Sequence, residues 1–109
     1  AYMKDLLAEE GDFSGAEFDT AFMLRAVLIG SRLAGARLHQ ATLTGAALED
    51  VDFSSADLTG ALLNGAQFSG AVFQDADLQD ARFVNGRLEG ARFKGARNMP
   101  EHLQRMLAK

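Results

Sequence analysis

No cysteine occurs in this sequence, so a disulfide, a thiolate zinc site and a thiol nucleophile are all excluded. No apolar run approaches the roughly 18 residues that a membrane-spanning helix needs, and no signal-peptide pattern is visible. The sequence begins at Ala1 rather than at a methionine, as an excerpt of a longer protein would, so a missing leader weighs little. We expect a cytoplasmic protein without a membrane span.

Residues that support catalysis or metal binding are also scarce. Histidine occurs only at His39 and His102, which fall in different structural settings. The sequence suggests no Ser–His–acid arrangement, no His–acid metal cluster and no phosphate-binding glycine loop. We therefore expect no enzymatic activity, no cofactor, no metal and no small-molecule substrate.

Basic residues are missing from the middle of the chain. Between Leu38 and Ala81 there is no Lys or Arg, and the whole chain has a net charge of −4. An acidic chain argues against nucleic acid as the main partner. The basic residues return as a belt around the late repeats, and an acidic middle with a basic end suggests head-to-tail contact between molecules. The belt comprises Arg82, Arg87, Arg92, Lys94 and Arg97.

The dominant pattern is a repeat of five residues. From Phe13 to Phe93, every fifth residue is large and apolar, and a small residue, mostly alanine, lies two places before it. Glycine, Asp or Asn usually lies two places after it, as expected for a type II turn at a corner. The exceptions suggest a different corner geometry early in the chain: Thr20, Arg25 and Gln40.

The units Ala56-Asp57-Leu58-Thr59-Gly60 and Ala76-Asp77-Leu78-Gln79-Asp80 resemble the pentapeptide-repeat family. The resemblance implies an all-β fold, a right-handed quadrilateral β-helix (solenoid) with four pentapeptides per coil and about four coils. Residues twenty apart would then stack. An internal aromatic column is predicted from Phe53, Phe73 and Phe93, with Phe13 and Leu33 below.

We divide the chain into residues 1–10, an N-terminal helical cap, residues 11–97, the repeat body, and residues 98–109, a C-terminal helical cap. The first cap rests on Tyr2, Met3, Leu6 and Leu7, which share one side at helical spacing. The second begins at Asn98 as N-cap, followed by Pro100 and Glu101. Its apolar face comprises Leu103, Met106 and Leu107.

Two outward surfaces are candidate sites. The first, the acidic patch, is either a solvated face or a protein-binding, DNA-mimicking surface; it comprises Asp50, Asp52, Asp57, Asp75, Asp77 and Asp80. The second, the apolar patch, comprises Phe22, Leu24, Val27, Ile29 and Leu62. Three interpretations of it are open: the N-terminal helix covers it, it is a homodimer or partner interface, or the register slips locally so that Met23 yields its core position.

These features favour a non-catalytic protein-interaction or scaffold module whose partner is another protein or a second copy. The alternative comes from the family resemblance. Some members resemble a DNA duplex in shape and charge, and bind bacterial type II topoisomerases such as DNA gyrase, which confers fluoroquinolone resistance. The alternative function is therefore a DNA-mimicking inhibitor or protector of a type II topoisomerase.

Overall fold

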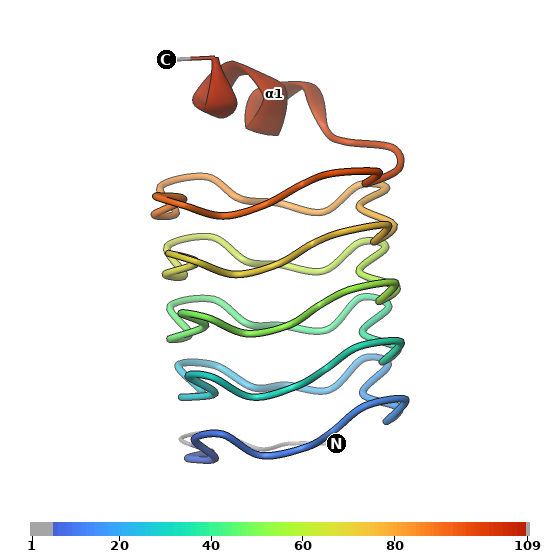
Figure 1. Cartoon of the computed structure of the whole chain (residues 1–109), viewed down its shortest axis with the longest axis vertical. Helices are drawn as coiled ribbons and strands as arrows, with labels where there is room; N and C mark the ends of the chain where they lie inside the picture. The colour runs from blue at the N-terminus through green and yellow to red at the C-terminus, as the bar shows by residue number, and fades with distance from the viewer. Residues whose placement is uncertain (1–5, 109) are drawn as a thin grey trace.

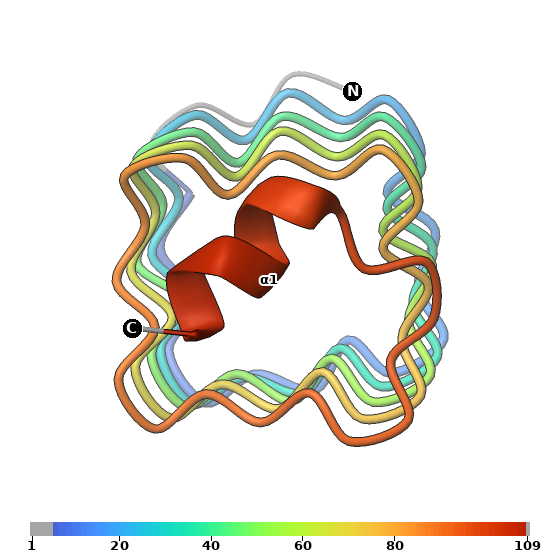
Figure 2. The ribbon, with the colours of Figure 1, turned by 90° about the horizontal axis from the view of Figure 1, so that it is seen from above.

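The computed structural model describes residues 6–108. From Leu7 to Arg97 the chain forms a solenoid in which isolated parallel β-bridges join residues twenty apart, beginning with Leu7–Val27 and ending with Asp77–Arg97. Figure 1 shows the coils stacked along the long axis of a molecule that measures 33 × 22 × 21 Å. Seen from the C-terminal end, the outline is square, and the chain winds anticlockwise as it approaches the viewer, in the sense of a right-handed coil (Figure 2).

Each five-residue unit combines a short ladder with a tight turn. Phe53 N–H donates to the carbonyl of Val72 on the next coil at 2.7 Å, and Ala56 N–H closes the turn on the carbonyl of Phe53 at 3.0 Å. Ser55, the third residue of that turn, has φ of 60°, as a type II turn requires. Several backbone hydrogen bonds along the axis and one around the corner therefore hold each regular unit.

All corners of the described repeats share this left-handed conformation. The expectation of a different geometry at the early non-glycine corners is wrong, because Thr20, Arg25 and Gln40 have φ of 60°, 57° and 58°. The ladder to the next coil imposes the turn, because the N–H groups of Thr20, Arg25 and Gln40 donate to the carbonyls of residues 39, 44 and 59. This pairing overrides the usual preference of these residue types.

The core is a narrow column of large side chains alternating with alanines. Phe73 stacks between Phe53 and Phe93, with ring centroids 5.0 and 4.9 Å apart and interplanar angles of 9° and 3°. The predicted aromatic column is therefore confirmed. Phe68 and Phe83 both meet Phe73 edge-on, and the buried side chains of all four sides form one continuous core.

Residues 6–10 form another unit of the solenoid, so the helix predicted over residues 1–10 is wrong for this part. Ala8 N–H donates to Val27 C=O and Glu10 N–H to Ile29 C=O, both at 2.9 Å. Leu6 takes the position of the small residue and Ala8 that of the large one, which hid the repeat in the sequence. A ten-residue helix is marginal in water, whereas this pairing continues an existing ladder. Tyr2 and Met3 lie outside the described residues.

The chain leaves the solenoid at Asn98 and forms helix α1, Glu101–Leu107, across its open end (Figure 2). Leu103 is fully buried against the core. The predicted N-cap is wrong: Pro100 holds that position, while Asn98 has φ of 57° and donates from its amide to Asp77 Oδ1 at 3.0 Å. Asn98 thus ends the solenoid rather than starting the helix.

Candidate functional site

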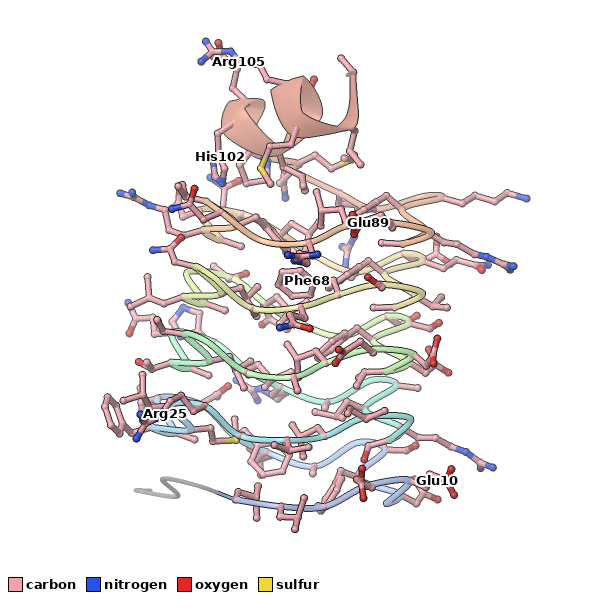
Figure 3. All side chains as sticks on the ribbon, turned by 90° about the vertical axis from the view of Figure 1, so that its left-hand side faces the viewer. Glu10, Arg25, Phe68, Glu89, His102 and Arg105 are labelled. Carbon is pink, nitrogen blue, oxygen red and sulfur yellow. The ribbon has the colours of Figure 1, made fainter. Side chains whose placement is uncertain are left out.

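The apolar patch lies on two adjacent sides of the solenoid that meet at the corner residue Arg25. Phe22 and Leu24 precede this corner and Val27 and Ile29 follow it, all at outward positions and half-buried. Figure 3 faces the second of these sides, with Arg25 at one edge and Glu10 at the other. Met23 is fully buried, so the predicted register slip is wrong.

Leu62, the fifth predicted member, stands apart from the other four. It pairs with Thr42, which in turn pairs with Phe22, so a polar residue separates the two apolar ones along the axis. Leu7, which sequence reasoning placed in a helix, belongs to the patch instead, because it pairs directly with Val27. Leu7 is 69% exposed, compared with 40% for Leu62. The five-residue step from Asp12 back to Leu7 was the signal that could have revealed it.

The described N-terminal residues do not cover this patch. Residues 6–10 run below residues 26–30 and continue the same side of the solenoid. The prediction that an N-terminal helix folds over the patch is therefore wrong for residues 6–10, and residues 1–5 lie outside the described residues. Apolar side chains consequently stand at five outward positions around this corner, whereas polar residues occupy most outward positions elsewhere in the repeat: Leu7, Phe22, Leu24, Val27 and Ile29.

Each aspartate of the acidic patch also has a local role in the backbone. Asp52, Asp57 and Asp77 accept the N–H group two residues further on, at 2.9, 3.0 and 3.1 Å. These contacts are Asx turns, which favour aspartate for local backbone reasons, whether or not a partner binds the surface. The other three occupy corners with φ close to 60°: Asp50, Asp75 and Asp80. Local geometry alone thus accounts for an acid at each of the six positions.

Asp57 has the most developed environment in the acidic patch. Its partial burial acts to raise the pKa of the carboxyl, but hydrogen bonds from Thr59 and the nearby charges of His39 and Arg37 outweigh burial and lower the pKa below its ordinary value. Asp57 pairs along the axis with Asp77, so two like charges stack on adjacent coils. The Asn98 amide on Asp77 relieves part of this repulsion.

Below Asp57, the same side alternates in charge. Arg37 lies 3.9 Å from a carboxylate oxygen of Glu17 and 3.2 Å from one of Asp19. Arg37 and Glu17 are solvent-exposed and Asp19 is only partly buried, so each ion pair stabilises the fold only slightly. At the other end, the predicted basic belt is exposed around the last coil; it comprises Arg82, Arg87, Arg92, Lys94 and Arg97.

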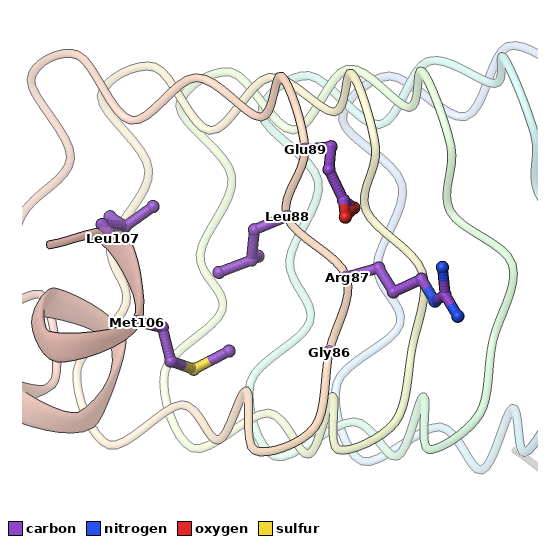
Figure 4. Close-up of a pocket in the computed structure, with 6 residues that line it drawn as sticks. All are labelled: Gly86, Arg87, Leu88, Glu89, Met106 and Leu107. Carbon is purple, nitrogen blue, oxygen red and sulfur yellow. The ribbon is translucent and has the colours of Figure 1, made fainter. Parts of the chain in front are cut away.

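Two shallow hollows lie beside α1. The larger, of about 530 Å³, has apolar walls from Leu88, Met106 and Leu107 and is flanked by Arg87 and Glu89 (Figure 4). The smaller, of about 310 Å³, lies between Asp80, Arg82, Pro100 and His102. The His102 side chain is already hydrogen-bonded, because its Nε2 accepts the N–H of Phe83 at 3.0 Å.

Residues 6–108 contain no group of three or more His, Asp or Glu side chains that could hold a metal ion. In the same part of the chain, no helix has the length and apolar character to cross a membrane. Three surfaces are thus the candidates for a functional site: the apolar patch, the acidic patch and the basic belt.

Comparison with known proteins identifies the repeat. The family model described as pentapeptide repeats matches eight copies, over residues 12–45, 23–60 and 52–90. A pentapeptide repeat protein from the thylakoid lumen of Arabidopsis thaliana is 27% identical with a TM-score of 0.79, and the match covers 95% of this chain and 74% of that one.

Two further solved structures show lower similarity. HetL, a pentapeptide repeat protein involved in heterocyst differentiation regulation in Nostoc sp. strain PCC 7120, is 25% identical with a TM-score of 0.46, over 88% of this chain and 48% of HetL. QnrB1, a plasmid-mediated fluoroquinolone resistance protein, is 19% identical with a TM-score of 0.41, over 98% of this chain and 66% of that one. No curated protein matches the sequence significantly.

Proposed function

The chain belongs to the pentapeptide-repeat family, and we propose that it is a non-catalytic interaction module that binds a protein, or a second copy of itself, through the apolar patch. The observation that carries this proposal is the placement of Leu7, Phe22, Leu24, Val27 and Ile29 at outward positions around one corner. An apolar surface of this kind, rimmed by polar residues, typically marks an interaction site.

The shape of the solenoid restricts how a partner binds. One side is about 20 Å wide and carries four or five stacked rungs over a height of about 20 Å, so its area is about 400 Å². A standard interface needs about 800 Å² from each partner. A partner must therefore wrap the corner at Arg25 and use both sides, which is how the apolar residues are distributed. A cytoplasmic location is part of this proposal.

The test is the double substitution Phe22→Ser and Ile29→Ser. Val72→Ser, at an equivalent outward position on another side, is the matched control. We expect the double variant to lose self-association in sedimentation equilibrium, or to lose the partners captured by the unaltered protein, with an unchanged circular dichroism spectrum. Equal association by all three proteins would show that this surface is unimportant.

A second candidate function is mimicry of DNA toward a type II topoisomerase, and the stacked pair Asp57–Asp77 favours it. From Asp50 to Asp80 the axis rises about 7 Å. Six carboxylates over this rise give about one charge per 1.2 Å, which is of the same order as the one per about 1.7 Å of duplex DNA. The basic residues Arg37 and Arg82 lie at the two ends of this patch, so it mimics only a fraction of one turn of the DNA helix.

A DNA gyrase supercoiling assay, with and without a fluoroquinolone, tests this second function. Salt-sensitive inhibition or protection that Asp57→Asn with Asp77→Asn removes would support mimicry. Asp12→Asn, another Asx-turn aspartate outside the patch, is the control. No effect at high micromolar protein would exclude mimicry and leave the interaction module.

A further inference from the structure

The two ends of the solenoid carry opposite charge. Residues 6–25 include five carboxylates and one guanidinium group: Glu9, Glu10, Asp12, Glu17, Asp19 and Arg25. Residues 81–98 include five basic side chains and one carboxylate: Arg82, Arg87, Arg92, Lys94, Arg97 and Glu89. Because these two segments lie at opposite ends of the long axis (Figure 1), the molecule has an axial charge dipole.

The N-terminal end also presents an open β-edge. Within the solenoid, a bridge residue directs both its backbone groups toward the preceding coil: Arg32 N–H donates to Gly11 C=O at 2.9 Å, and Arg32 C=O accepts Phe13 N–H at 2.7 Å. At Leu7, Asp12 and Glu17 the corresponding groups find no hydrogen-bond partner within residues 6–108. An open edge of this kind is a template for pairing with another chain, and the charged residues along it determine which protein surfaces can approach.

The core at this end is open as well. Phe13 and Phe18 are only partly buried, whereas at the other end α1 covers Phe83 completely. Beside α1, the groove lined by Leu88, Met106 and Leu107 leaves apolar surface accessible. Each end therefore combines some apolar surface with a rim in which one sign of charge predominates.

We propose that the acidic N-terminal end of one copy docks on the basic C-terminal end of a second copy, so that molecules stack head to tail along the solenoid axis. Two N-terminal ends repel each other, and so do two C-terminal ends, so the head-to-tail arrangement is the favourable one. This contact is heterologous, so it generates open rows rather than a closed dimer.

The chain already contains the charge pairs that this stacking repeats. Glu17 lies 3.9 Å from Arg37, one coil above it, and a backbone β-bridge places Arg97 one coil above Asp77. If the twenty-residue step continues into the next copy, Asp12 of the second copy faces Arg92 and its Glu17 faces Arg97. Helix α1 separates the two rims by about 10 Å, so extended side chains rather than backbone bridges make these pairs.

The dimensions predict a weak and salt-sensitive contact. An end of 22 × 21 Å offers less than the roughly 800 Å² per partner of a standard interface. The separation imposed by α1 is close to the Debye length of about 10 Å at 0.1 M salt. We therefore expect stacking at hundreds of micromolar protein in low salt, and an association constant about tenfold lower in 0.3 M salt.

Charge exchange between the ends tests the proposal. Glu9→Lys, Glu10→Lys and Glu17→Lys together change the charge of residues 6–25 from −4 to +2, so both ends are basic. Arg87→Glu, Arg92→Glu and Lys94→Glu together change the charge of residues 81–98 from +4 to −2, so both ends are acidic. We expect neither variant to associate alone in low-salt sedimentation equilibrium, and an equimolar mixture to regain the association of the unaltered protein. A side-by-side contact would not produce this rescue. Circular dichroism checks that both variants are folded.

Two results would overturn the inference: concentration-independent sedimentation of the unaltered protein in low salt, or a mixture that sediments as its separate components. The variant Phe22→Ser with Ile29→Ser, run in the same assay, separates this contact from the apolar patch. Association that persists in that variant supports an end contact. Association that is lost in that variant would show that the apolar patch makes the contact, and would refute the inference.

Discussion

The carboxylate of Asp50 occupies the space that a Cβ atom at position 70 would take, one coil further along the axis. Asp75 has the same relationship to Gly95. A corner side chain leans toward the corner of the following coil, and a glycine there accommodates it. Left-handed φ explains why glycine is allowed at a corner, and this contact explains why particular corners need it.

Replacing Gly70 by alanine should therefore cost more than the same change at Gly65. Both glycines have φ near 70°, but a Cβ at position 65 meets no atom within 4 Å. We expect Gly65→Ala to lower the free energy of unfolding by about 1 kcal/mol and Gly70→Ala by about 2–3 kcal/mol, measured by urea denaturation. Asp50→Gly should bring Gly70→Ala back toward the value for Gly65→Ala. Equal losses at both positions would contradict this account.

Phe73→Ala should be among the most destabilising substitutions, because it removes the middle ring of the column formed with Phe53 and Phe93. We expect a loss of about 3–5 kcal/mol in the free energy of unfolding. Ala76→Leu should also destabilise, since the narrow core cannot expand around a larger residue. Melting like that of the unaltered protein in both variants would refute the core register.

His102 should protect the last rung of the ladder. In the regular solenoid, Leu63 N–H donates to the carbonyl of Arg82 at 2.8 Å, and twenty residues later His102 Nε2 provides the acceptor for Phe83 N–H at 3.0 Å. His102→Phe leaves this donor unpaired, which should cost about 1 kcal/mol and speed hydrogen exchange of the Phe83 amide. His102→Gln retains a hydrogen-bond acceptor, so the Phe83 amide should exchange more slowly in this variant than in His102→Phe. Unchanged exchange in His102→Phe would show that the contact contributes nothing.

Acid should weaken the fold partly through Asp57. Because its folded pKa is lowered, its contribution is present above the unfolded value of about 3.9 and is lost as the pH falls through the lower folded value. The difference in unfolding free energy between the unaltered protein and Asp57→Asn should thus shrink from pH 7 to pH 3. Thr59→Ala should raise the Asp57 titration midpoint in an NMR titration; an unchanged midpoint would exclude the hydrogen bond as a cause.

The repeat made most of the fold predictable, because period five fixes which side chains point inward. Prediction failed where side-chain size departed from the pattern, as at Leu6 and Ala8, and where one residue type serves two roles. Asn98 could cap a helix or hold a left-handed corner, and only its contact with Asp77 decides. Among the candidate surfaces, four of the five apolar residues lie together, while Leu7 was missed and Leu62 stands apart.

The pairing of residues twenty apart has a consequence for how such a chain changes during evolution. An insertion of five residues in the middle of the solenoid would turn every later side chain by a quarter of a revolution, carrying Asp77 to a different side from Arg37. An insertion of twenty residues would leave all directions intact and only move the two halves about 4.8 Å further apart. Insertion length thus sets the relative orientation of the surfaces at the two ends independently of the residues that compose them.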